Sequence, residues 1–202
     1  MTDERKEELI EELIKVEYAL FDRVDNEGGR AACQDDYLTF YAMRKSQYLT
    51  WNIETIESLY NDMVTNRDKG RNLVTEKYAR MMESTAPEEY KKIEALLPKV
   101  GDEAKRIIES VVAIEVEWME AFAKAHPNIS MRARNIRTAT DTPYETSAET
   151  YLRGELMTYS MDTLYLYARR VVELYKEGAN MIEMTMFNTI KMYGYERFED
   201  VK

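Results

Sequence analysis

Residues 141–175 read DTPYETSAETYLRGELMTYSMDTLYLYARRVVELY, and this stretch decides the fold class. Thr146 followed by Glu149 is the capping-box pattern, which predicts that a helix begins near Ser147. Apolar residues then recur at helical spacing to the end of the stretch. We therefore expect one long central helix near residues 147–177.

Two apolar arcs lie on this helix when its residues are placed at about 100° each. They comprise Leu152, Leu156, Tyr159, Leu166 and Leu174 in the first, and Met157, Met161, Tyr165, Ala168, Val172 and Tyr175 in the second. A helix that is apolar over this width is typical of the middle of a bundle. The arc left for solvent comprises Tyr151, Glu155, Thr158, Asp162, Arg169, Glu173 and Lys176. Arg153 lies between the apolar arcs, where a charge without a partner is costly, so we expect it to have one.

The composition agrees with a helical fold. Of the 202 residues, 45% are hydrophobic and 33% are charged, which is ordinary for a folded chain. With 7 Gly and 4 Pro the chain has few residues that interrupt regular secondary structure, which favours long helices over many short strands. The sequence shows no linker and no repeat. It predicts an all-α fold in which residues 1–202 form a single domain, a bundle of about six to seven largely antiparallel helices.

Further helices are predicted from apolar periodicity and capping residues. They span about residues 3–24, 35–51, 53–68, 73–81, 87–97, 102–125 and 180–193. Whether Gly70 ends one helix or only weakens a longer one is left open. About 20 residues between Pro127 and Thr146 are expected to form a loop, whose length is typical of a functional segment.

Charge and rare residues exclude several functions. The net charge of −10 argues against nucleic acid or an anionic membrane as a partner, and no apolar run approaches the ~18 residues of a membrane span. The chain has one cysteine and its start has no signal-peptide pattern, so a cytoplasmic location is expected. A single histidine excludes metal motifs built on two imidazoles, and we expect no metal site.

Four charged residues fall at the centre of apolar arcs on four separate helices: Glu17, Arg44, Glu115 and Arg153. Two acids and two bases on buried faces predict one contact network, since an unpaired buried charge costs several kcal/mol. The network could be purely structural, or it could line a polar pocket between helices. In the second interpretation Glu17 and Glu115 are the candidate catalytic acid or base, while Arg44, Arg153 and Gln47 are candidate ligand-binding residues.

Loops contribute weaker candidates. Gly28, Gly29 and Arg30 could form a backbone nest for an anion, although a paired glycine is more often only a turn. Arg132, Arg134 and Arg137 could bind a carboxylate or phosphate, or could pair with nearby acids. Cys33 and His126 have no assigned role; His126 is better explained as a helix-end residue than as a catalyst.

The chain resembles the domain of unknown function 4125 family of bacterial and archaeal proteins. The stretches that carry the resemblance are Asp25 to Trp51, Thr75 to Glu89 and Asp141 to Ser160. The resemblance implies a small α-helical intracellular protein with no agreed activity, and a nucleotidyltransferase-like domain as a partner of some relatives. Helical ribonuclease partners of such enzymes carry an arginine four to seven residues before a histidine, and no arginine precedes His126 at that spacing.

Two function classes therefore remain. The first is a protein that binds a small anionic molecule over the buried Glu/Arg layer; if it is also an enzyme, a buried glutamate is its acid or base. The second is a non-enzymatic interaction or regulatory protein whose buried charges are only structural. No cofactor is specified by either. An open pocket at the layer would favour the first, and a closed, fully paired network would favour the second.

Overall fold

The computed structural model describes residues 2–25 and 29–201, which form ten α-helices, four short 3₁₀ helices and no strand. The helices are α1 (Thr2–Phe21), α2 (Tyr37–Tyr48), α3 (Ile53–Asp68), α4 (Leu73–Thr85), α5 (Pro87–Ile93), α6 (Asp102–Ala125), α7 (Pro127–Ser130), α8 (Ala148–Leu156), α9 (Met161–Glu177) and α10 (Met181–Met192). The all-α prediction is confirmed. The expected number of six to seven helices is too low, because the predicted central helix is divided and the predicted loop after α6 contains α7.

The long central helix expected near residues 147–177 is two helices. Ser160 is extended, with φ −62° and ψ 163°, and its side chain accepts a hydrogen bond from the amide of Thr163 as the N-cap of α9. The carboxylate of Asp62 accepts hydrogen bonds from the Ser160 amide at 3.0 Å and from the Thr163 hydroxyl at 2.6 Å. These bonds satisfy donors at the start of α9 and stabilise the break, since serine and threonine compete with helical hydrogen bonds.

The start of α8 is also shifted by one residue from the predicted cap. Ser147, not Thr146, is the N-cap, and its hydroxyl accepts from the Thr150 amide at 3.2 Å. Glu149 does not close a capping box with Thr146, because its carboxylate accepts from the Thr138 amide at 2.8 Å. The segment before α8 is therefore hydrogen-bonded to α8 through the Glu149 side chain, and a capping-box motif does not predict such a contact.

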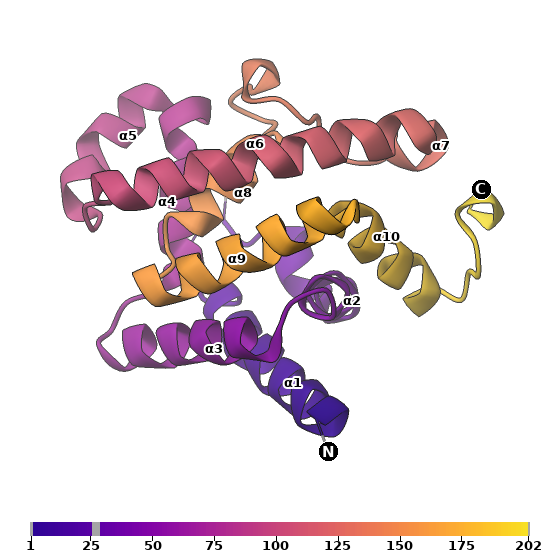
Figure 1. The fold of residues 1–202 in the computed structure, drawn as a ribbon. Helices are drawn as coiled ribbons and strands as arrows, with labels where there is room; N and C mark the ends of the chain where they lie inside the picture. The colour runs from indigo at the N-terminus through magenta and orange to yellow at the C-terminus, as the bar shows by residue number, and fades with distance from the viewer. Residues whose placement is uncertain (1, 26–28, 202) are drawn as a thin grey trace.

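The packing places α9 between α6 and α3 (Figure 1). At one end of this layer α2 packs against α10, and at the other α8 packs against α4 and α6. The largest fully buried side chains join these helices: Trp51, Tyr48, Tyr167, Ile10, Leu13, Ile14, Ile56, Leu59, Ile108, Leu156, Leu164 and Met181. Gly70 has φ +77° after the last residue of α3, so it ends a helix. Within the described residues no helix is both long and apolar enough to span a membrane.

Gly154 allows α8 to approach α4 closely. A Cβ at this position would lie 3.0 Å from the Met81 side chain and 3.1 Å from the backbone oxygen of Lys77. Both contacts are tighter than ordinary packing, and the backbone oxygen cannot move independently of α4. Glycine at this position therefore allows the next residue, Glu155, to lie next to Lys77.

We expect Gly154→Ala to lower the free energy of unfolding by about 1–3 kcal/mol, because the overpacking outweighs the better helix propensity of alanine. Gly101→Ala is the matched control, since a Cβ at Gly101 meets nothing within 4 Å. The control should change the free energy by less than about 1 kcal/mol. Urea unfolding of both variants measures the difference, and a Gly154→Ala protein as stable as the wild type would contradict this packing argument.

Candidate functional site

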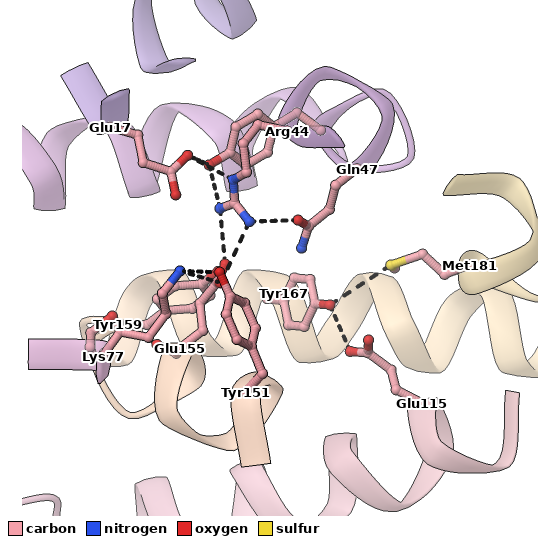
Figure 2. Close-up of polar contacts among 12 residues, drawn as sticks. Glu17, Arg44, Gln47, Lys77, Glu115, Tyr151, Glu155, Tyr159, Tyr167 and Met181 are labelled. Carbon is pink, nitrogen blue, oxygen red and sulfur yellow. Dashed lines mark hydrogen bonds and ion pairs between the residues drawn. The ribbon is translucent and has the colours of Figure 1, made fainter. Parts of the chain in front are cut away.

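Arg44 on α2 is the centre of a buried polar network (Figure 2). Its Nε donates to Glu17 Oε2 on α1 at 2.7 Å, and its Nη2 donates to Glu155 Oε1 on α8 at 2.9 Å. Nη1 donates to Gln47 Oε1 at 2.7 Å and lies 3.5 Å from Glu155 Oε2. Nη2 also donates to the hydroxyl of Tyr48 at 2.7 Å. These are five contacts from three nitrogens, and a guanidinium group has five N–H donors.

The two carboxylates of the network are each bound from more than one side. The Tyr48 hydroxyl donates to Glu17 Oε2 at 2.6 Å, so the Glu17 carboxylate accepts hydrogen bonds from both Arg44 and Tyr48 of α2. Glu155 accepts from Lys77 Nζ on α4 at 3.3 Å and from the Tyr159 hydroxyl at 3.0 Å. All four charged residues of this network are buried: Glu17 (2% exposed), Lys77 (5%), Glu155 (7%) and Arg44 (8%). Two acids and two bases leave the network formally neutral.

The pKa values of the network follow from this pairing. Burial alone would lower the pKa of Arg44, but the fields of Glu155 and Glu17 outweigh it and raise the pKa well above its ordinary value. Burial alone would raise the pKa of Glu155, but Arg44 and Lys77 lower it to about 2. Lys77 also has a raised pKa, because Tyr151 and Glu155 outweigh its burial. Arg44, Lys77 and Glu155 therefore remain ionised near neutral pH.

Glu115 on α6 is buried, at 3% exposure, but lies outside this network. Its Oε1 accepts from the Tyr167 hydroxyl of α9 at 2.6 Å, and that hydroxyl lies 3.9 Å from the sulfur of Met181 on α10 (Figure 2). In the described part of the chain no lysine or arginine forms an ion pair with Glu115. Burial therefore raises the pKa of Glu115 to about 7, against the lowering effect of the Tyr167 hydrogen bond and with a small raising effect of Glu155.

Arg153 does not join the network, contrary to the expectation. Its side chain is 23% exposed and pairs with Glu109 at 2.8 Å and with Glu149 at 3.0 Å. Nη1 donates to the Thr138 hydroxyl at 3.2 Å. A helical wheel drawn for one continuous helix over residues 147–177 does not apply to the shorter α8, in which Arg153 faces α6 whereas Glu155 faces α2 and α4. Glu155, assigned to solvent by that wheel, is the buried partner of Arg44.

Burial was correctly predicted for Glu17, Arg44 and Glu115, but the sequence argument missed Glu155 and Lys77. A signal for Lys77 was present, because it lies four residues after Leu73 and four before Met81, on the buried face of α4. The same rule that selected Glu17 would have selected it. For Glu155 the adjacent Leu156 and the helix-facing Gly154 are the only local signals.

The residues predicted as an anion nest are arranged differently. Gly28 lies outside the described residues, and Gly29 is exposed with φ +86°. Arg30 is about half exposed and pairs with Asp22 at 2.5 Å and with Asp35 at 2.8 Å. Its charge is therefore already matched by two acids of its own neighbourhood.

Two of the loop arginines, Arg134 and Arg137, and the two rare residues form no ion pair or hydrogen bond with the four charged residues of the network. Arg137 pairs with Glu120 at 2.6 Å, and Arg134 donates to the Thr146 carbonyl and lies over the Tyr151 ring at 5.1 Å. The His126 ring packs 4.3 Å from that of Phe198 at the end of α6, in agreement with a helix-end role. Cys33 is exposed.

Two surface pockets occur elsewhere. One of about 510 Å³ lies between α3 and α9, and the other, of about 520 Å³, lies between α10 and the C-terminal segment. Neither pocket is lined by Glu115 or by a residue of the Arg44 network. Across residues 2–25 and 29–201 no group of three or more His, Cys, Asp or Glu side chains is placed to hold a metal ion.

Comparison with known proteins gives one match. A family model described as "Protein of unknown function (DUF4125)" matches residues 7–202, and it confirms the resemblance found in three stretches of the sequence. No curated protein and no solved structure matches the chain. With nearly its whole length matched, the chain belongs to the DUF4125 family.

Proposed function

We propose that this protein is a non-enzymatic interaction or regulatory protein, and that its buried charges serve the architecture of the bundle. The observation that carries this proposal is the saturation of Arg44, whose five contacts all end on groups of the same chain. An incoming anion would find no free N–H on this guanidinium group, and neither surface pocket reaches it.

The network has a physical role that needs no ligand. It joins α1 to α2 through Glu17, and α2 to α8 and α4 through Glu155, which is 111 residues from Arg44 in the sequence. A buried ion pair contributes little net stability compared with apolar residues, but a mismatched register would leave a buried charge unpaired at a cost of about 3–5 kcal/mol. We therefore assign to the network the selection of one packing of these four helices.

A second candidate function rests on Glu115. A buried carboxyl group without a counter-charge, and with a pKa of about 7, has the property of a general acid or base. In that proposal a small anionic molecule lies between α6, α9 and α10, Glu115 and Glu17 are the catalytic acids or bases, and Arg44, Gln47 and Arg153 orient the anion. The pairing of Arg153 with Glu109 and Glu149 favours the architectural proposal instead.

Native mass spectrometry together with calorimetry separates these proposals. The variants are Arg44→Met and Glu115→Gln, which remove a charge with little change in volume. We expect the purified wild type to have the mass of the chain alone, and each variant to differ only in its thermal midpoint. A small molecule that is bound to the wild type and lost from a folded Glu115→Gln protein would overturn the architectural proposal.

A further inference from the structure

The groove between α10 and the C-terminal segment is separate from the buried network. Its volume is about 520 Å³, and it lies where the chain leaves α10 and bends back toward the end of α6 (Figure 1). We call it the α10 groove, defined by Glu183, Met184, Phe187, Glu196, Phe198 and Glu199. No part of the proposed architecture uses these residues.

The floor of the α10 groove is apolar because α10 has more apolar residues than the core can cover. Met181 and Ile190 are buried, whereas Met184 and Phe187 are each 36% exposed and lie three residues apart on one face. Phe198 forms the opposite wall, and its ring packs on those of Phe122, His126 and Phe187 at 5.4, 4.3 and 5.8 Å. The wall is therefore anchored to α6, and the groove is preformed.

The rim of the α10 groove is acidic. Glu183, Glu196 and Glu199 are exposed, and none of them forms an ion pair in the described part of the chain. Arg197 is paired with Asp200 at 2.8 Å, so its charge is matched. A second cation, Lys191, has its Nζ 4.9 Å from the centre of the Phe187 ring.

The other pocket lacks this combination. Between α3 and α9 the carboxylates of Glu54, Glu57 and Asp162 also form an acidic rim, but Tyr165 and Leu166 are its only large apolar residues. The Tyr165 hydroxyl donates a hydrogen bond to Glu103 at 2.5 Å, so one of these two side chains carries a polar group at its tip. It serves as a natural control surface of similar size and charge.

We propose that the α10 groove docks a basic amphipathic segment of a partner protein. Methionine and phenylalanine side chains adapt to varied apolar surfaces, and a helix bound in a groove places apolar anchors at a spacing of three or four residues. Lysine or arginine residues on the flanks of such a segment match Glu183, Glu196 and Glu199. This inference rests on the proposed function, for which it names the interaction surface and the class of partner.

A second copy of the chain is a poorer occupant. Its net charge is −10, and a two-fold contact through the same groove would place two acidic rims against each other. Like charges in an interface oppose association. A basic segment is attracted to the same rim, so charge complementarity selects it.

The test uses fluorescence anisotropy with the full-length chain and designed peptides of about 18 residues. Three peptides have Leu, Met or Phe at positions i, i+3, i+4 and i+7 and lysine on the remaining face; matched peptides have glutamate in place of lysine. We expect at least one lysine peptide to bind with a micromolar dissociation constant, more weakly as salt is raised, and no glutamate peptide to bind.

Matched charge reversals locate the binding. The double variant Glu196→Lys/Glu199→Lys should weaken binding of the lysine peptide by at least about tenfold, because it places positive charges on the rim opposite the positive charges of the peptide. The double variant Glu54→Lys/Glu57→Lys makes the same change in net charge at the control pocket. It should weaken binding of the lysine peptide by less than about threefold. Met184→Ala, which shortens a partly exposed side chain of the groove floor, should weaken binding about fivefold.

Four results would overturn the proposal: no binding by any lysine peptide, equal binding by the glutamate peptides, equal losses in the two charge-reversal variants, or a dimer in sedimentation velocity that Met184→Ala dissociates. These variants leave the Arg44 network intact. Failure here therefore leaves the architectural proposal standing, and a ligand found on the Arg44 network by mass spectrometry would remove that proposal without deciding this one.

Discussion

Replacing Arg44 with Met should lower the free energy of unfolding by about 3–5 kcal/mol. The substitution leaves the carboxylates of Glu17 and Glu155 buried, at 2% and 7% exposure, without the guanidinium that both contact. Lys77 still pairs with Glu155 at 3.3 Å, so the carboxylate of Glu17 carries most of the penalty. Urea unfolding at pH 7 measures the change.

Arg169→Ala is the control for loss of an arginine. Arg169 is about half exposed and lies 3.7 Å from Glu173, so its removal should change the free energy by less than about 0.5 kcal/mol. Arg153→Ala should fall between the two, because Arg153 is partly exposed and its partner Glu109 is exposed. Equal stabilities for the Arg44 and Arg169 variants would contradict the network.

A double-mutant cycle tests whether the loss comes from pairing. Arg44→Met and Glu155→Gln should each destabilise the protein, but the double variant should be more stable than the sum of the two losses predicts. The physical reason is that the second substitution removes a carboxylate that the first has left without its main partner. Additive effects of the two substitutions would mean that Arg44 acts by packing alone.

Glu115→Gln should make the protein more stable by about 3 kcal/mol at pH 8 and by only about 1 kcal/mol or less at pH 5. Burial raises the pKa of Glu115 from an ordinary value of 4.5 to about 7 in the folded chain. Below pH 4.5 the group is protonated in both folded and unfolded states. As the pH rises toward 7 and beyond, the unfolded chain ionises first, and the stability that the neutral group contributes is lost.

The measurement is the free energy of unfolding in urea at pH values from 5 to 8. The wild type should lose stability over this range more steeply than Glu115→Gln, since glutamine keeps an acceptor for the Tyr167 hydroxyl and does not ionise. Glu117, exposed on the same helix, provides the control: Glu117→Gln should retain the pH dependence of the wild type. Parallel curves for the wild type and Glu115→Gln would refute the raised pKa.

Glu155 has the opposite dependence on pH. Its pKa in the folded chain is lowered from 4.5 to about 2, despite its burial, by Arg44 and Lys77. The stability that it contributes is therefore complete above pH 4.5 and is lost as the pH falls toward 2. Together with Glu115, this pairing should place the contribution of the two buried carboxylates at its most favourable near pH 4.5 to 5.

The all-α class, and the helices whose signals are local, can be predicted from the amino-acid sequence alone. α6 spans Asp102–Ala125 as expected, because two acids open it and Pro127 follows its end. The burial of Glu17, Arg44 and Glu115 can also be predicted, since each lies between apolar residues at helical spacing. Each of these predictions depends only on the spacing of residues within a single helix.

The position of the break in the central helix and the pairing of the buried charges depend on contacts between residues far apart in the sequence. The break between α8 and α9 is held by Asp62, which is 98 residues from Ser160. Gly154 sets how closely α8 approaches α4, and that approach places Glu155 between Arg44 and Lys77 while Arg153 turns to Glu109. Helical periodicity identifies a buried face but not the neighbour that covers it, because the partner of a buried charge depends on how separate helices cross.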